Sequence, residues 1–335
     1  MLYKQVIQLV FLKGFFKLKF LDFEKKTINT WADFEKKTNQ ITPFDQLSWK
    51  KIWIEHFGNN YDGELIFNDI FFAPIKIKNK VASFIGSKDL VDYNNFLSNG
   101  NSFDKLELFL EKLFTLDIQS LRLDSISEET LLFSTLKNNT LGLKYNITIK
   151  EEDVAPYIIL PENWDQYLLS LNKKRRHEIK RKIRRLEENV EFSSGDLNSI
   201  SDKDEILEDF FRLHKLSSQE KKSFMNKKRE DFFTDLILDY LNKESLLYSY
   251  LKIDNKTVAC SISFIMNNNR YLYNSGFDPD YIKHSSGLLN HVFAIKRSIE
   301  NNFNIFDFMR GNERYKYDLG GIDKKVFSIH LEKKE

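Results

Sequence analysis

Two hydrophobic periods occur along the chain. In the second half, apolar side chains recur at every second position over residues 246–253, 257–266 and 270–277. Polar turn sequences, Asp-Asn-Lys and Asn-Asn-Asn, separate these three segments. A period of two bounded by turn residues predicts half-buried strands joined by hairpins. The sequence therefore predicts an antiparallel sheet built from these segments.

Between the predicted strands, apolar residues recur with the spacing of an α-helix. Residues 164–189 are predicted to form one long helix, for which Asn163 provides the N-cap. Residues 288–302 predict another helix after the hairpins, and further strands are predicted at 303–309 and 325–333. Because strands and helices interleave in both halves, we expect a mixed α/β (α+β) fold.

The chain is long enough for two domains. It has 335 residues, and an acidic turn with a proline at residues 151–156 separates the two patterned halves. We therefore expect domains at 1–152 and 153–335. Hydrophobic residues make up 41% of the chain, enough for a sizeable core. The net charge of +2 argues against a dedicated nucleic-acid-binding surface.

Few residues suggest disulfides, metal sites or targeting. The single cysteine, Cys260, excludes an internal disulfide and is expected to be a buried thiol, and no histidine spacing suggests a metal. The apolar run within residues 1–20 is broken by Gln8 and Lys13, is too short to span a bilayer and lacks the cleavage site of a signal peptide. The single thiol fits a reducing compartment, so we expect a cytoplasmic protein without a transmembrane segment. Residues 16–23 predict a strand with one wet face; a membrane-surface helix with peripheral membrane contact is the alternative.

Charged residues directly follow the predicted strand FNIFDFM. Glu313 is suited to act as a general base on an amine, and Tyr315 or Tyr317 to protonate a leaving thiolate. Lys316 or Arg310 would neutralise phosphate or a developing oxyanion. The alternative is that all of them belong to an ordinary solvated turn.

The segment 274–290 joins a strand to a helix. Ser285, Ser286 and Gly287 begin this helix, where unpaired backbone N–H groups and the positive end of the helix dipole favour an anion. Glycine also allows a ligand to approach the backbone closely. The segment therefore predicts a pyrophosphate site with His284 beside it, and ordinary helix capping is the alternative.

Residues 172–189 form a strongly basic stretch. Nine Lys or Arg stand against three Glu, while Ile179, Ile183 and Leu186 keep one stripe apolar. Side chains such as Arg175 and Arg176 suit bidentate contacts with phosphate. Compatible partners are the phosphates of CoA, an anionic glycan or lipid head group, and tRNA, and a plain solvated helix is the alternative.

Three stretches together resemble the acetyltransferase domain of the CelD-like group. This group is a branch of the GNAT superfamily allied to the FemAB peptidoglycan aminoacyltransferases. The stretches are NKKRRHEIKRKIRRLEE, Tyr273 to Gly276 followed by HSSGLL, and FDFMRGNERYK. The family pattern in the last stretch falls on Asp307, Gly311, Glu313, Tyr315 and Lys316. SWKKIWIEHFG, APIKIKN and GSKDLVDYNNFL extend the resemblance over most of residues 31–320.

The resemblance implies tandem GNAT-like (FemAB-like) domains, each a mixed, mostly antiparallel sheet flanked by helices. It implies an N-acyltransferase that uses acetyl-CoA or another acyl-CoA, with direct attack of an amine on the thioester. The acceptor would be a small-molecule or glycan amine, such as an amino sugar or a cell-envelope precursor. The implied site residues are, as catalytic, Glu313, Lys316 and Tyr315; as cofactor-binding, Ser275, Gly276, His284, Ser285, Ser286, Gly287 and Arg310; and as substrate-binding, Asp307, Tyr273, Arg175 and Arg176.

Two other functions stay open on the sequence. One is an aminoacyl-tRNA-dependent ligase of the FemAB kind, although the chain lacks the long heptad run that such enzymes generally carry. The other is a non-catalytic binding module with the same fold. The usual GNAT phosphate loop, Arg/Gln-x-x-Gly-x-Gly/Ala, is absent, and HSSG is a reduced version of it.

Overall fold

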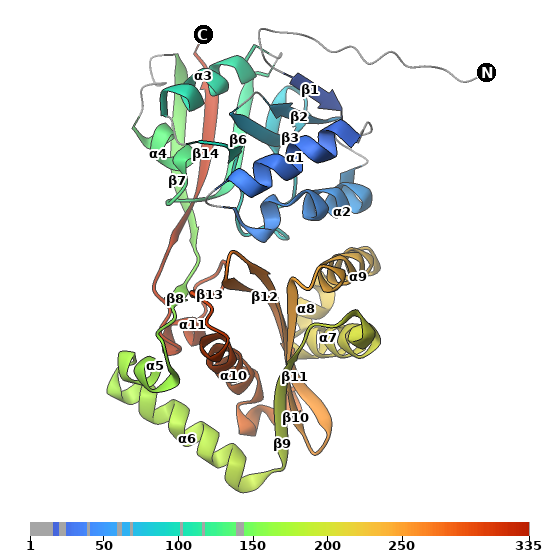
Figure 1. The fold of residues 1–335 in the computed structure, drawn as a ribbon, viewed down its shortest axis with the longest axis vertical. Helices are drawn as coiled ribbons and strands as arrows, with labels where there is room; N and C mark the ends of the chain where they lie inside the picture. The colour runs from blue at the N-terminus through green and yellow to red at the C-terminus, as the bar shows by residue number, and fades with distance from the viewer. Residues whose placement is uncertain are drawn as a thin grey trace, which may run out of the picture. The chain divides into compact units, whose positions relative to one another are not determined.

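The computed structural model describes residues 16–19, 25–38, 41–58, 62–67, 70–100, 103–115, 118–138 and 144–334. The chain divides into two compact units (Figure 1). The first comprises Met1–Asp153 and Lys325–Glu335, and the second Val154–Lys324. Of the strand predicted over residues 16–23, only β1 (Phe16–Lys19) lies within the described residues.

The first unit contains a mixed sheet in the order β1-β2-β3-β4-β6-β14-β7, with the short β5 on β3. Its other strands are β2 (Asp62–Phe67), β3 (Phe71–Lys78), β4 (Val81–Phe84), β5 (Leu97–Ser98), β6 (Ser120–Ser127), β7 (Tyr145–Val154) and β14 (Lys325–Lys333). Its helices are α1 (Lys25–Lys37), η1 (Pro43–Asp45), α2 (Leu47–Phe57), α3 (Phe103–Leu113) and α4 (Leu131–Lys137). Phe71, Phe109 and Leu121 lie in its buried core. β4 and β6 are parallel neighbours.

The C-terminal strand corrects the expected domain division. The sequence placed residues 325–333 in the second domain, but β14 pairs antiparallel with β6, with Val326 opposite Ser127. The alternating pattern of these residues predicts a strand but carries no information about which sheet it joins. The second unit is therefore inserted between two segments of the first.

The second unit contains a six-stranded sheet in the order β8-β13-β12-β11-β10-β9. Its strands are β8 (Tyr157–Ile159), β9 (Phe192–Leu197), β10 (Leu246–Ile253), β11 (Lys256–Met266), β12 (Asn269–Phe277) and β13 (Ile305–Asp307). Its helices are α5 (Trp164–Ser170), α6 (Lys173–Asn189), η4 (Ile200–Asp202), α7 (Lys203–Ser217), α8 (Gln219–Phe224), α9 (Lys227–Asn242), η5 (Pro279–His284), α10 (Ser286–Glu300) and α11 (Arg314–Asp318). The predicted hairpins are confirmed, since β10, β11 and β12 pair antiparallel in sequence. Helices α5, α6 and α10 cover one face of the sheet, and α7 and α9 cover the other (Figure 1).

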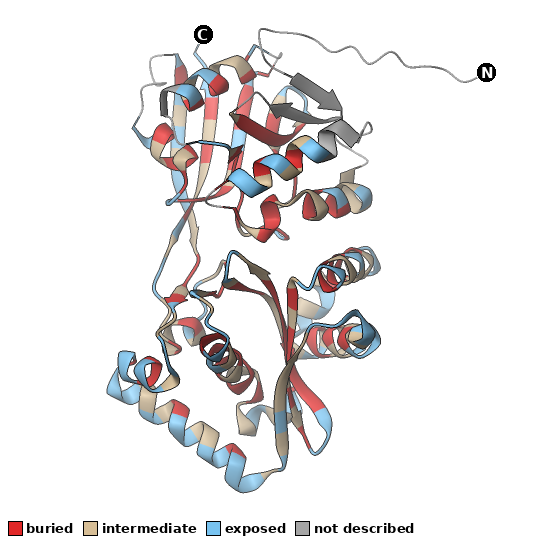
Figure 2. Ribbon diagram, in the orientation of Figure 1, coloured by how far each residue is buried: buried red, intermediate tan, exposed pale blue. Residues whose placement is uncertain are grey.

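The single long helix predicted over residues 164–189 is wrong. Leu171 is buried and has an extended backbone conformation, which ends α5. Asn172 then begins α6, and its side chain accepts a hydrogen bond from the Arg175 backbone N–H at 2.9 Å. Asparagine favours this capping position over a helix interior because its amide competes for backbone hydrogen bonds. The outer face of α6 is exposed along most of its length (Figure 2).

A buried ion network ties the sheet to α10. The guanidinium of Arg270, fully buried on β12, donates to the Asp196 carboxylate at 3.0 Å, and Arg297 of α10 donates to the same carboxylate at 2.8 Å. Although burial raises the pKa of Asp196, the two arginines, Arg270 first, outweigh it and lower it to about 2. The network fixes α10 against β9 and β12.

Candidate functional site

Strands β12 and β13 separate soon after they meet. They pair in parallel only from Asn269 opposite Ile305 to Tyr271 opposite Asp307. β12 then continues to Phe277, whereas the backbone N–H of Phe308 donates to Pro156 at 2.9 Å on the other side. The two strands therefore diverge, and this leaves one edge of β12 without a neighbouring strand beyond Tyr271.

Side chains satisfy the backbone of this β12 edge. The N–H of Phe277 donates to the Ser217 hydroxyl at 2.8 Å, and the N–H of Ser275 donates to the Asn274 side chain at 3.1 Å. The Ser275 carbonyl accepts a hydrogen bond from Lys221 Nζ at 2.6 Å. Burial lowers the pKa of Lys221, while Cys260 and Glu313 act in the opposite direction. A cation of α8 thus lies beside the separated strands, in the electrostatic range of Glu313.

The other residues predicted on β12 have packing contacts. A Cβ on Gly276 would lie 2.4 Å from the His214 backbone nitrogen, so glycine allows the close approach of β12 to α7. The ring of Tyr273 stacks on Phe233 with centroids 5.7 Å apart. These contacts lie on the face covered by α7 and α9, opposite to α10, and packing accounts for both residues.

The start of α10 meets the basic helix. Ser285 has a left-handed backbone, with φ of 56°, and its hydroxyl accepts a hydrogen bond from Lys182 Nζ of α6 at 2.7 Å. The Ser286 hydroxyl is fully buried and has no hydrogen-bond partner, and a Cβ on Gly287 would lie 3.3 Å from the Phe277 ring. Burial lowers the pKa of His284, and Lys283 and Arg185 lower it further. The predicted cradle residues are thus together in a cationic environment.

Lys316 occupies a different place from the one predicted. Its ammonium is almost fully buried and donates to the carbonyls of Met309 at 3.0 Å, Arg310 at 2.8 Å and Gly311 at 3.1 Å. The Glu313 carboxylate lies 2.8 Å from the same nitrogen. With every N–H used, this ammonium holds the loop together and has no donor left for a phosphate.

Asp307 is likewise committed to the fold. Its side chain is 1% exposed and accepts hydrogen bonds from the Met309 backbone N–H at 2.7 Å and from Lys324 Nζ at 3.0 Å. Met309 and Gly311 both have positive φ, 61° and 115°. Asp307 and the buried ammonium together hold this left-handed turn, so Lys316 is buried although its neighbours Glu313 and Arg314 are exposed.

Glu313 and Tyr315 remain as the groups suited to proton transfer. The Glu313 side chain is 57% exposed. The Tyr315 ring stacks on His291 of α10, with centroids 5.2 Å apart. Burial and, secondarily, Glu313 raise the pKa of Tyr315, so its phenol stays protonated at neutral pH. Because His291 lies one helical turn after Gly287, Tyr315 is close to the start of α10.

The predicted arginines are spread over three environments. Arg175 Nε lies 3.5 Å from an Asp318 carboxylate oxygen, which brings the start of α6 to α11. Arg176 Nη1 makes long, 3.5 Å contacts with the Leu168 and Leu169 carbonyls at the end of α5. Arg310 is part-buried, and its carbonyl is one of the acceptors of the loop lysine. Their ligand roles stay predictions.

Sequence reasoning missed two residues of this region. Lys221 lies on a short helix among many surface lysines, so its burial beside β12 has no sequence signature. Burial lowers the pKa of His291 to about 3, with Lys221, Arg270 and Lys316 adding to the effect, so its imidazole is neutral. A polar residue in the apolar stripe of α10 was the only available signal. Cys260 is buried as expected, which raises the pKa of its thiol to about 12.

The described part of the chain contains neither a metal-binding cluster nor a membrane-spanning helix. In the described part of the chain, no three His, Cys, Asp or Glu side chains are grouped so as to hold a metal ion. None of the helices in that part combines the length and hydrophobicity needed to cross a bilayer.

The chain is similar to a known protein family and to several solved structures. Residues 173–317 match the family described as Acetyltransferase (GNAT) domain, a range that runs from α6 to α11. No curated protein matches the sequence. A conserved protein of unknown function from Bacteroides thetaiotaomicron is 12% identical over 92% of this chain and 97% of its own, with a TM-score of 0.62. FemX is 11% identical over 90% of this chain and 95% of its own, with a TM-score of 0.61.

The C-terminal domain of a putative lysylphosphatidylglycerol synthetase from Agrobacterium fabrum is similar as well. It is 9% identical over 91% of each chain, with a TM-score of 0.58. At such identities the similarity concerns the fold. The expected fold, two mixed sheets flanked by helices in the FemX-like arrangement, is confirmed.

Proposed function

We propose that the second unit is an N-acyltransferase that moves an acyl group, in the first instance acetyl, from an acyl-CoA to an amine. The observation that carries this proposal is the separation of β12 and β13 beside the start of α10. Glu313 and Tyr315 follow the second of these strands, and Tyr315 contacts α10. The match of residues 173–317 to the GNAT acetyltransferase domain supports the same chemistry.

In this proposal the donor lies along the exposed edge of β12. The amide groups of its pantetheine arm would exchange with the side chains that now satisfy Ser275 and Phe277. Its pyrophosphate would meet the first turn of α10 at Ser285 to Gly287, where Lys182 supplies a positive charge. The unpartnered Ser286 hydroxyl is a further donor at this place.

The reaction needs two proton transfers. The amine gives a proton to the Glu313 carboxylate as its nitrogen attacks the thioester carbonyl. When the tetrahedral intermediate collapses, the carbon–sulfur bond breaks and the departing thiolate takes the phenolic proton of Tyr315. The products are an amide and free CoA, and solvent returns the proton from Glu313 to Tyr315. Lys316 acts indirectly, because it positions the loop that carries Glu313.

The acceptor class rests on resemblance. The CelD-like group suggests an amino sugar or a cell-envelope precursor, and the single thiol agrees with action in the cytoplasm.

The proposal is tested by a thermal-shift series with acetyl-CoA and longer acyl-CoAs, followed by a thiol-release assay. At least one acyl-CoA should stabilise the protein saturably. Glu313→Gln should then lower kcat by about 10²–10⁴-fold. Glu162→Gln, which changes an exposed glutamate of the same unit, is the matched control and should leave kcat unchanged. Absence of stabilisation by every acyl-CoA, with no effect of Glu313, would instead indicate a non-catalytic binding module.

A second candidate donor is an aminoacyl-tRNA. It is favoured by exposed cations of α6 that make no ion pair with any residue the structure describes, namely Lys173, Lys174, Lys180 and Arg185. These contrast with Arg181, which is paired with Glu178 at 2.8 Å. This candidate predicts tRNA binding that falls steeply with salt and weakens when these cations are replaced by glutamine. Failure of the protein to retain tRNA at low salt would remove it.

A further inference from the structure

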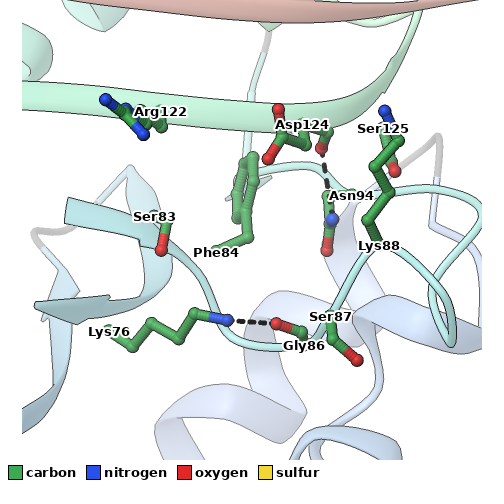
Figure 3. Close-up of a pocket in the computed structure, with 10 residues that line it drawn as sticks. All are labelled: Lys76, Ser83, Phe84, Gly86, Ser87, Lys88, Asn94, Arg122, Asp124 and Ser125. Atoms are coloured by element: carbon green, nitrogen blue, oxygen red, sulfur yellow. Dashed lines mark hydrogen bonds between the residues drawn. The ribbon is translucent and has the colours of Figure 1, made fainter. Parts of the chain in front are cut away.

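The first unit repeats the strand divergence of the second. Strands β4 and β6 pair in parallel only from Val81 opposite Ser120 to Ser83 opposite Arg122. A pocket of about 90 Å³ opens where they part (Figure 3). Typical pockets for drug-sized ligands measure about 300–1,000 Å³, so this one suits a small ligand. Its lining is polar and consists of Lys76, Ser83, Phe84, Gly86, Ser87, Lys88, Asn94, Arg122, Asp124 and Ser125.

A buried lysine outside the pocket holds one of the lining side chains in place. Lys50, which is fully buried, donates to the Asn94 side-chain oxygen at 2.8 Å and to the Ile85 carbonyl at 2.7 Å. The Asn94 amide nitrogen in turn donates to the Asp124 backbone carbonyl at 3.2 Å (Figure 3). A buried ammonium that orients a lining amide gives the pocket a defined shape before any ligand binds.

Two of the pocket's cations are already engaged. Lys88 lies 2.9 Å from a Glu152 carboxylate oxygen. Lys76 donates to the Gly86 carbonyl, and its ammonium lies 4.6 Å from the centroid of a Trp53 ring. These contacts satisfy both lysines within the protein.

Two lining residues of opposite charge are not engaged. Among the residues that the structure describes, the Asp124 carboxylate accepts no hydrogen bond and makes no close ion pair, although Lys88, Arg122 and Lys76 act on it electrostatically. In the same part of the chain, the exposed Arg122 guanidinium donates no hydrogen bond. Two residues apart on β6, their side chains leave the same face of the strand, with Cα atoms roughly 7 Å apart. Burial raises the pKa of Asp124, and the neighbouring Glu152 raises it further, so a bound cation would relieve this cost.

We propose that this pocket binds a small zwitterion, a free α-amino acid, with its ammonium on Asp124 and its carboxylate on Arg122. One charge of each sign at this spacing, neither held by a close ion pair among the described residues, matches a ligand whose ammonium and carboxylate are attached to the same carbon. The Ser83 and Ser125 hydroxyls line the same pocket. The site lies within the first unit and does not depend on the activity proposed for the second.

The test is isothermal titration calorimetry of the full chain with glycine, alanine, lysine and glutamate. Methylamine and acetate, which carry one charge each, serve as half-ligands. At least one amino acid should bind saturably, and both half-ligands should bind at least ~10-fold more weakly. Acetate binding as tightly as the amino acids, or no saturable heat up to ~10 mM of any amino acid, would overturn the proposal.

Point variants of the pocket residues test whether the amino acid binds in this pocket. Asp124→Asn and Arg122→Gln should each weaken binding at least ~10-fold. The matched controls Glu107→Gln and Lys105→Gln, on α3 of the same unit, should leave it unchanged. Glu313→Gln should also leave it unchanged, which distinguishes this site from an acceptor site in the second unit. Full affinity in both pocket variants would place the amino acid elsewhere and refute the assignment. Because Arg122 is exposed, its variant keeps the test valid if Asp124→Asn misfolds.

Discussion

Replacing Lys316 by methionine should destabilise the second unit strongly. Methionine keeps the length of the side chain but removes the buried ammonium, which bonds three backbone carbonyls and the Glu313 carboxylate. Each buried carbonyl left without a donor costs about 1 kcal/mol, and loss of one partner of a buried ion pair costs about 3–5 kcal/mol in total. Because Glu313 is largely exposed and recovers hydration, we expect a loss near the lower end, about 3–4 kcal/mol.

This loss is large enough to measure by heat. For a domain of 150–250 residues, 1 kcal/mol shifts Tm by about 2–4 °C, so the variant should melt roughly 6–16 °C lower. Differential scanning calorimetry is the suitable assay because the two units can unfold in separate transitions. Lys180→Met, which removes an exposed and unpaired ammonium of α6, should change Tm by no more than about 1 °C.

A small effect would refute the reasoning. If Lys316→Met melts within about 2 °C of the wild type, the three carbonyl contacts do not hold the loop. Glu313→Gln should instead lower turnover with little change in Tm, because the Glu313 side chain is largely exposed and the Lys316 ammonium keeps its three carbonyl acceptors.

Three further predictions concern the second unit. Gly276→Ala should lower the free energy of unfolding by at least ~3 kcal/mol in urea titrations, because its Cβ would lie 2.4 Å from the His214 backbone; a loss below ~1 kcal/mol would contradict this. Asp196→Asn removes the carboxylate that pairs with the buried Arg270 and the half-buried Arg297 and should cost about 3–5 kcal/mol, whereas Asp231→Asn, at an exposed pair, should cost less than about 1 kcal/mol. Burial lowers the pKa of His214 and of His291 to about 3, so the unfolded chain binds more protons between pH 6.5 and 3. Stability should therefore fall as pH drops through this window, by roughly 3 kcal/mol per histidine at pH 4, and replacing either histidine by glutamine should flatten that slope.

Local patterns were sufficient for most strands of the second unit. Alternation and turn residues predict β10, β11 and β12 because a strand's faces and a hairpin's turn are read over a few residues. Asn163 was predicted as a cap and does accept a hydrogen bond from the Gln166 N–H at 3.0 Å.

Features set by distant contacts could not be predicted. The sequence shows Asn172 inside a helical pattern, but only the buried position of Leu171 makes the chain turn there. The same limit applies to Lys316, whose acceptors are backbone carbonyls that carry no sequence signature. The sequence does not show whether a charged side chain after a strand contacts a ligand or the backbone of its own loop.

The place of β14 has a consequence for protein synthesis. This strand lies between β6 and β7 in the first sheet, yet it is encoded after the whole second unit. During synthesis, residues 154–324 can complete their own sheet without residues 325–333. The first sheet, by contrast, lacks the strand between β6 and β7 until β14 has been made. A released chain truncated after Lys324 should therefore contain a folded second unit and a protease-sensitive first unit, although the first unit is translated earlier.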